Sequence, residues 1–188
     1  KEKIQSMWNL SENRALEKSG QDRLMNQYLY INSVSFRYAP QQATELEPGV
    51  EKPIARLTNS QLKRLYGHYR SGLSSWGQGQ STGGKNKEGK DKEVMQLEML
   101  AVVREVLFRQ TGKYLYPVQL LTVLNSIFTE GNVLNQINTG EGKTVITAVT
   151  AAMLVGLDED SVVDISSSTN TLAREAKDEM GSFYEALG

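Results

Sequence analysis

The residues best suited to chemistry in this chain form one short stretch, Asn-Thr-Gly-Glu-Gly-Lys-Thr at positions 138–144. Glycines let the backbone turn tightly, so that successive N–H groups and the positive end of a following helix converge on an anion. In such a loop Lys143 reaches the β- and γ-phosphates of a nucleotide, and the Thr144 hydroxyl binds Mg²⁺. The stretch therefore predicts a triphosphate and magnesium site. Its residues are Thr139, Gly140, Glu141, Gly142, Lys143 and Thr144.

The segments on either side of this loop must position it. Residues 132–137 alternate apolar and polar side chains, as a short strand does. A helical run follows from Thr144 and closes at Gly156, a typical C-terminal stop. Strand, glycine loop and helix in this order favour a phosphate-binding loop, although the usual pattern opens with glycine where this chain has Ile137. The alternative is a glycine-rich turn that caps an ordinary helix.

Composition narrows the class of protein. The 188-residue chain carries 21 Lys and Arg against 22 Asp and Glu, so it lacks the basic surplus of a protein that binds a nucleic-acid backbone. Cysteine is absent, which excludes disulfides and thiol chemistry and fits an intracellular protein. The longest apolar-leaning run, residues 148–157, is too short to span a bilayer, and the N-terminus lacks the apolar core of a secretory signal. We expect a soluble chain that begins inside a larger parent.

The N-terminal part is predicted to be mainly helical. Residues 1–32 indicate two helical pieces, with a break at Ser19-Gly20. Residues 33–38 alternate in polarity and predict a short strand or extended segment. Residues 40–56 contain three prolines and predict a linker.

The middle of the chain predicts a capped helix and then a mobile loop. Thr58 and Gln61 have the spacing of a capping box, and apolar residues recur at helical spacing up to Leu73. Residues 77–93 are rich in glycine and then in alternating charges, a composition that cannot bury a core. His68 has no second histidine or acidic cluster nearby, so we assign it no metal or acid–base role.

Four more elements are predicted toward the C-terminus. An apolar stripe predicts a helix over residues 94–111, and another helix covers residues 120–127. Residues 162–165 predict a second buried strand, although Asp164 interrupts it, and the polar run 166–170 is expected to cap a last helix. The expected core face of that helix is Leu172, Ala176, Met180, Phe183 and Leu187.

Residues 57–188 resemble the start of the motor domain of SecA, the ATPase that drives preproteins through the bacterial Sec channel. The stretches that carry the resemblance are residues 57–73, residues 100–105 with Val118-Gln119-Leu120, the loop 139–144, and residues 170–174 with 180–188. The resemblance implies an α/β fold, a partial RecA-like P-loop motor domain with parallel strands flanked by helices. A mainly helical extension at residues 1–56 would precede it.

The resemblance also implies a ligand, partners and a location. ATP or ADP with Mg²⁺ would bind at the loop, and Lys143 and Thr144 would be the catalytic residues. A polypeptide substrate, a membrane translocation channel and the rest of the motor domain, in cis or in trans, would be the partners. The intact protein would be cytoplasmic, with peripheral contact to the membrane.

Two residues outside the loop are further candidates for the nucleotide site. The Gln119 amide can pair with both N6 and N7 of adenine, which selects ATP over GTP, and it precedes the loop at a spacing typical of helicase-type ATPases. The alternative for Gln119 is a surface glutamine at a helix start. Arg174 could face phosphate or substrate, whereas an arginine on an exposed helix is usually only solvated.

The chain departs from the SecA pattern in ways that bear on activity. Tyr116-Pro117 stands where the family has Phe-Asp, and no Asp-Glu-Ala-Asp-type run follows the predicted second strand. The carboxylates that hold magnesium and activate water, and the lobe that would supply an arginine finger, are therefore missing. We expect this chain alone to be incomplete for hydrolysis.

Two other functions remain open at this stage. One is a superfamily-two helicase-like ATPase acting on nucleic acid, because such enzymes share the loop and also tolerate a residue other than glycine at its start. The neutral charge balance counts against it. The other is a vestigial motor half that serves as a protein-interaction module, with residues 1–56 recruiting a partner.

Overall fold

The computed structural model describes residues 18–37, 54–74, 92–129, 131–158 and 160–188. All regular structure within these ranges is helical. The elements are α2 (Lys18–Arg37), the 3₁₀-helix η3 (Ile54–Arg56), α3 (Asn59–Ser74), α4 (Lys92–Thr111), α5 (Pro117–Phe128), α6 (Lys143–Leu157) and α7 (Asn170–Leu187).

The predicted α/β fold is wrong for the described part of the chain. Residues 132–137 and 162–165 are extended but belong to no sheet there, and residues 33–37 continue α2 as a helix. A strand needs a neighbour to accept its backbone hydrogen bonds. In the first segment one face, Val133, Asn135 and Ile137, is half-buried, but no neighbouring strand pairs with it within the described residues. The apolar residues Leu134 and Val162 point to solvent, at 97% and 87% exposed.

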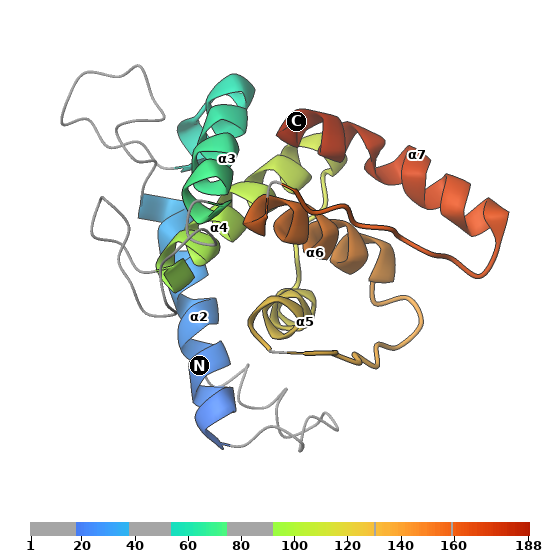
Figure 1. Cartoon of the computed structure of the whole chain (residues 1–188), viewed down its shortest axis with the longest axis horizontal. Coiled ribbons are helices and arrows are strands. Elements are labelled where there is room, and N and C mark those ends of the chain that lie inside the picture. Colours follow the sequence, from blue (N-terminus) through green and yellow to red (C-terminus); the bar gives the residue numbers. More distant parts are fainter. Residues whose placement is uncertain (1–17, 38–53, 75–91, 130, 159) are drawn as a thin grey trace.

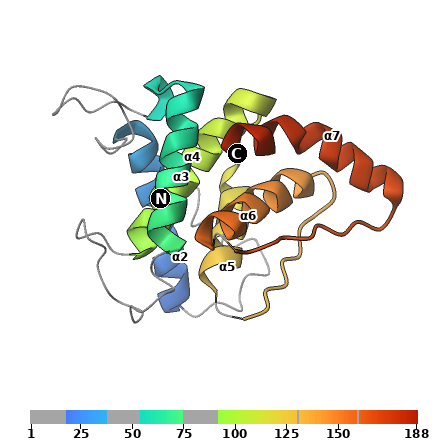
Figure 2. The ribbon, with the colours of Figure 1, turned by 45° about the horizontal axis from the view of Figure 1, so that its top comes forward.

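Helix α4 lies at the centre of the molecule, with α2, α3, α6 and α7 packed around it (Figures 1 and 2). The expected stripe is part of a wider buried surface, because α4 is apolar on nearly all sides over its middle turns. Its buried residues are Met95, Leu97, Met99, Leu100, Ala101, Val102, Val103, Val106 and Leu107. The core of the described residues is therefore a helix surrounded by helices.

Local signals placed the ends of several helices correctly. The capping box before α3 is confirmed, because the Thr58 N–H donates to Gln61 Oε1 at 2.8 Å and the Gln61 N–H donates to Thr58 Oγ1 at 3.2 Å. Helix α4 ends at Thr111, and Gly112 follows with a φ of 69°. Thr169 caps α7 by accepting a hydrogen bond from the Leu172 N–H at 3.2 Å.

Helix α7 is only half buried. Met180, Phe183 and Leu187 are buried as predicted, whereas Leu172 near its start is 49% exposed. The N-terminal half of the helix extends away from the body in Figure 1. The predicted core face is therefore correct for the second half of α7 and wrong at Leu172.

Helix α2 packs on the same body. Its Arg23 and Gln27 both donate to the Glu93 carboxylate at the start of α4, at 3.0 and 2.7 Å. The guanidinium of Arg23 also lies 5.9 Å from the centre of the Phe128 ring at the end of α5. The predicted break at Ser19-Gly20 falls inside this helix, since α2 begins at Lys18.

Several predictions concern residues outside the described ranges. The first helical piece before residue 18, most of the linker at 40–56 and most of the loop at 77–93 lie there. Within the described part, Ile54–Arg56 form η3, and Lys92 and Glu93 belong to α4. The division at residues 56 and 57 stays a prediction. Within the described ranges, each helix is too short or too polar to cross a membrane.

Candidate nucleotide-binding site

Two glycines shape the loop that leads into α6. Gly140 has a φ of 86° and Gly142 a φ of 75°, values that favour glycine because other residues carry a Cβ that clashes there. Gly142 is the N-cap of α6. A Cβ at Gly142 would lie 2.5 Å from Nε2 of Gln119, so any larger residue would require the Gln119 side chain to move. The loop is thus a tight glycine turn directly before a helix, as predicted.

The first turn of α6 presents backbone donors. The N–H groups of Val145 and Ile146 donate to the Gly142 carbonyl at 3.0 and 3.2 Å. The N–H groups of Lys143 and Thr144 have no backbone acceptor in the described part of the chain, as expected at the start of a helix. Free amides and the helix dipole make this end attractive to an anion.

The charged side chain at this end is available. Lys143 is exposed, and it forms no ion pair with another described residue. Thr144, the next residue, is half-buried. An ammonium and a hydroxyl therefore lie at the same helix start as the free amides, which is the donor set that a metal-bound polyphosphate requires.

The Gln119 side chain connects the loop to α5 by a hydrogen bond. Its side chain is only 5% exposed, its Oε1 accepts from the Tyr116 N–H at 2.9 Å, and its Nε2 donates to the Glu141 carbonyl at 2.8 Å. Pro117 occupies the first position of α5, where its missing N–H costs no hydrogen bond. The Gln119 amide retains one N–H and one lone pair beyond these contacts. The adenine contact stays a prediction, and the alternative of a surface glutamine is wrong.

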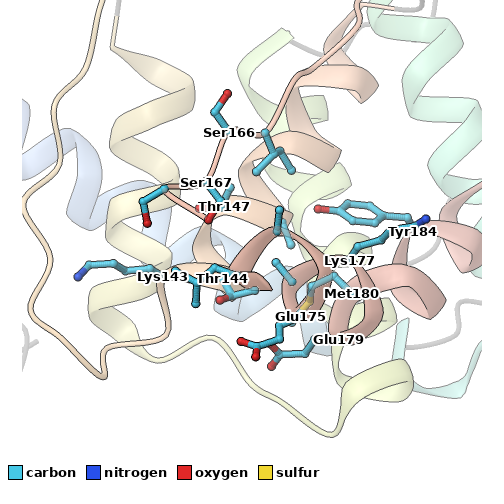
Figure 3. Close-up of a pocket in the computed structure, with 16 residues that line it drawn as sticks. Lys143, Thr144, Thr147, Ser166, Ser167, Glu175, Lys177, Glu179, Met180 and Tyr184 are labelled. Atoms are coloured by element: carbon cyan, nitrogen blue, oxygen red, sulfur yellow. The ribbon is translucent and has the colours of Figure 1, made fainter. Parts of the chain in front are cut away.

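A cavity of about 700 Å³ adjoins the start of α6. It lies between α6, the extended residues 165–168 and α7, with Lys143 and Thr144 toward one side and Tyr184 toward the other in Figure 3. Its lining combines small apolar residues such as Ala148 with hydroxyls. Its volume is within the range of small-ligand pockets. Burial raises the pKa of the Tyr184 phenol above its ordinary value of 10.0.

Arg174 does not line the cavity beside the loop, whereas two acidic residues of α7 do. Arg174 is exposed on the second turn of α7 and does not line the cavity, so its proposed role stays a prediction. Glu175 and Glu179 do line the cavity, from one face of α7. Among the described residues there is no group of three or more His, Asp or Glu side chains that could hold a metal ion.

The candidate site is therefore a glycine turn followed by Lys143 and Thr144 at the N-terminus of α6. The family described as the SecA DEAD-like domain matches residues 14–188, and the chain belongs to this family. The match starts before residue 57, so it includes α2, where the sequence had suggested no resemblance.

Relatives from several bacteria agree with this assignment. Protein translocase subunit SecA 2 of Geobacillus thermodenitrificans is 31% identical over 148 residues, which cover 79% of this chain and 16% of that protein. Protein translocase subunit SecA of a Nitratiruptor species is 31% identical over 76% of this chain and 14% of its own length. The chain thus spans a small part of the proteins it matches. No solved structure matches it significantly.

Sequence reasoning missed the contacts that link the loop to the rest of the molecule. Gln119 was selected for adenine, not for its hydrogen bond to Glu141, which lies 22 residues away in the chain. The ion pair between Lys113 and Glu179 joins residues 66 positions apart. No local pattern identifies such pairs, because they depend on how α5 and α7 pack.

Proposed function

We propose that this chain is the nucleotide-binding part of a SecA-type motor ATPase. The observation that carries the proposal is the glycine turn with two positive φ angles directly before Lys143 and Thr144, in a chain that belongs to the SecA DEAD-like family. In the intact protein, ATP binding and hydrolysis would drive lobe closure and move a polypeptide.

Each residue of the loop has a role in this proposal. The amides at the start of α6 and its dipole hold the phosphates, and Lys143 neutralises their charge. The Thr144 hydroxyl would help to hold Mg²⁺, which when bound would withdraw negative charge from the phosphates. Thr139, Gly140, Glu141 and Gly142 form the turn, and Gln119 would read the adenine with its remaining N–H and lone pair.

Hydrolysis needs a set of carboxylates that the described part of the chain does not bring together at the loop. We propose that other parts of the intact protein supply the carboxylates for magnesium and water, because the chain covers only 16% of the SecA 2 relative. Nucleotide binding and hydrolysis are then separable, and this chain carries the residues for nucleotide binding.

The decisive experiment titrates the full-length parent protein with ATP and Mg²⁺ by calorimetry, with and without Lys143→Ala. We expect Lys143→Ala to weaken binding about 10- to 100-fold, because it removes a charge-assisted contact to phosphate. Lys177→Ala is the matched control, since it removes an exposed lysine from the rim of the same cavity. Equal affinity of the wild type and Lys143→Ala would reject the site.

The proposed substrate is a polypeptide rather than a nucleic acid. The formal charge of −1 gives the chain no basic surplus for a phosphate backbone, and the matched relatives are named as protein translocase subunits. An unfolded polypeptide should therefore stimulate the ATPase activity of the parent, whereas single-stranded DNA or RNA should not. Stimulation by nucleic acid alone would favour a helicase instead. A translocation channel partner and a peripheral membrane location belong to the same proposal.

A further inference from the structure

An ion pair ties the outermost helix to the segment that precedes the candidate site. Lys113 Nζ contacts the Glu179 carboxylate across the gap between the α4–α5 connection and α7. Glu179 is also one of the residues that line the cavity beside Thr144 (Figure 3). The pair thus touches both α7 and the approach to α5.

The α4–α5 connection, residues 112–116, is short and held at several points. The Gly112 N–H donates to the Phe108 carbonyl at 2.8 Å, and the Tyr114 ring stacks on Phe108 at 3.9 Å between centres. Leu115 is buried in the core. Residues 112–116 therefore have little conformational freedom, so a shift of the Lys113 backbone also moves the residues that follow it.

The far end of this connection holds the side chain that contacts the glycine turn. The Tyr116 N–H donates to Gln119 Oε1, and Gln119 Nε2 donates to the Glu141 carbonyl. Gly142 lies so close to Gln119 that a Cβ there would be 2.5 Å from Nε2. Contacts consequently run without interruption from Glu179 through Lys113, the connection and Gln119 to the loop.

We propose that Lys113 and Glu179 are positioning residues for the phosphate-binding loop, so that the attachment of α7 helps to set nucleotide affinity. This inference rests on the proposed nucleotide-binding function. The ion pair holds the connection, the connection orients Gln119, and Gln119 fixes the Glu141 carbonyl. Loss of the ion pair loosens residues 113–116, so Gln119 holds the Glu141 carbonyl less firmly and the loop presents its amides in a less defined geometry.

The expected effect is modest. The Lys113 and Glu179 side chains are 45% and 38% exposed, so water and salt screen the pair. Leu115 and the stacked Tyr114 continue to hold the connection when the pair is lost. We expect a loss of about two- to fivefold in ATP affinity, in line with the strength of exposed ion pairs.

The test is a double-mutant cycle in the full-length parent, with MgATP affinity measured by calorimetry. The variants are Lys113→Ala, Glu179→Gln and their combination, with Lys113→Arg as the conservative variant. A charge swap, Lys113→Glu with Glu179→Lys, keeps the net charge constant. Glu175→Gln and Lys177→Ala are the matched controls, because both residues line the same cavity and neither forms an ion pair with another described residue.

We expect each single loss to weaken binding, the double loss to be no worse than either single loss, and Lys113→Arg to bind like the wild type. The swap should recover most of the affinity, and 1 M salt should reduce the difference between the wild type and Lys113→Ala. Multiplicative losses, or losses equal to those of the controls, would overturn the inference. If one single variant fails to fold, the charge swap is compared with the wild type instead. A folded swap that binds MgATP as poorly as the remaining single variant would contradict the positioning role of the ion pair.

The outcome is distinguishable from failure of the proposed function. Lys143→Ala, run alongside, reports whether the loop binds nucleotide at all. If Lys143→Ala leaves the affinity unchanged, the proposed function fails and this inference with it. If Lys143→Ala abolishes binding while the cycle is additive, only the positioning role of the ion pair is wrong.

Discussion

Gly142 carries the tightest steric constraint in the candidate site. Its φ of 75° disfavours any Cβ, and a Cβ there would also meet Gln119 Nε2 at 2.5 Å. Gly140 has a similar φ of 86° but open space around the missing Cβ. Substitutions at the two glycines therefore distinguish the cost of backbone strain from the cost of contact with Gln119.

We predict that Gly140→Ala lowers the free energy of unfolding by about 1 kcal/mol, from backbone strain alone. Gly142→Ala should cost about 1–3 kcal/mol more, because the new methyl group displaces Gln119. Urea unfolding of both variants, with nucleotide titration beside it, measures the difference. Equal losses in the two variants would show that Gln119 moves aside freely.

Gln119→Glu tests the hydrogen bond that fixes the loop. The carboxylate can still accept from the Tyr116 N–H but cannot donate to the Glu141 carbonyl, so we expect weaker nucleotide binding and faster hydrogen exchange of the loop amides. Burial against a carbonyl should raise the pKa of the new carboxyl. The defect should therefore shrink as pH falls, because the protonated form can donate again. A defect that is independent of pH would mean that the Glu141 contact is not what holds the loop.

The glycine turn and the start of α6 could be predicted because their residues are contiguous. Glycine, lysine and threonine at fixed spacing define the turn and the helix start without knowledge of the rest of the chain. The hydrogen bond from Gln119 to the loop could not be predicted, since a glutamine amide can pair with adenine or with a backbone carbonyl equally well. Only the packing of α5 against α6 decides which partner lies within reach.

At the scale of elements, Tyr66 joins α3 to α6. Its hydroxyl donates to the Ala152 carbonyl at 2.7 Å, and Gly156 lies so close that a Cβ there would be 2.9 Å from the same hydroxyl oxygen. Burial raises the pKa of Tyr66 above 10.0, and Arg70 offsets this only in part. The neutral phenol is therefore the form that the folded state favours.

The sign of the pH effect follows from this raised pKa. Above pH 10.0 the unfolded state loses the Tyr66 proton while the folded state keeps it, so stability falls as pH rises toward the folded pKa. Tyr66→Phe should lose about 1 kcal/mol of stability at pH 7 and show a shallower decline above pH 10.0. Urea titrations at several pH values measure both effects. Parallel curves for the wild type and the variant would contradict the assignment.

Helices were more predictable than extended segments for a physical reason. A helix satisfies its hydrogen bonds within about four residues, so caps such as Thr58 and Thr169 and the spacing of apolar residues suffice to locate it. A strand depends on neighbours that local sequence does not specify. Residues 132–137 and 162–165 carry the strand pattern, yet the described part of the chain offers them no ladder.

At the scale of the whole molecule, the question is whether α2 belongs to the same folding unit as the loop. The sequence placed it in an extension ending at residue 56, whereas the family match begins at residue 14. In the structure, Ile31 of α2 is fully buried, and Arg104 of α4 donates to Asn32 at 3.2 Å. Arg104 is half-buried, and this burial lowers its pKa.

We therefore predict that α2 and α6 unfold together. Ile31→Ala should lower the free energy of unfolding by about 2–4 kcal/mol through the cavity it leaves, and it should do so in a single transition. Hydrogen exchange of the α6 amides should accelerate by the corresponding factor, although α6 lies far from Ile31 in the sequence. Asn26→Ala, on the exposed face of α2, is the matched control and should change neither quantity. Two separate transitions, with α6 unaffected by Ile31→Ala, would instead support an independent extension and a boundary near residue 56.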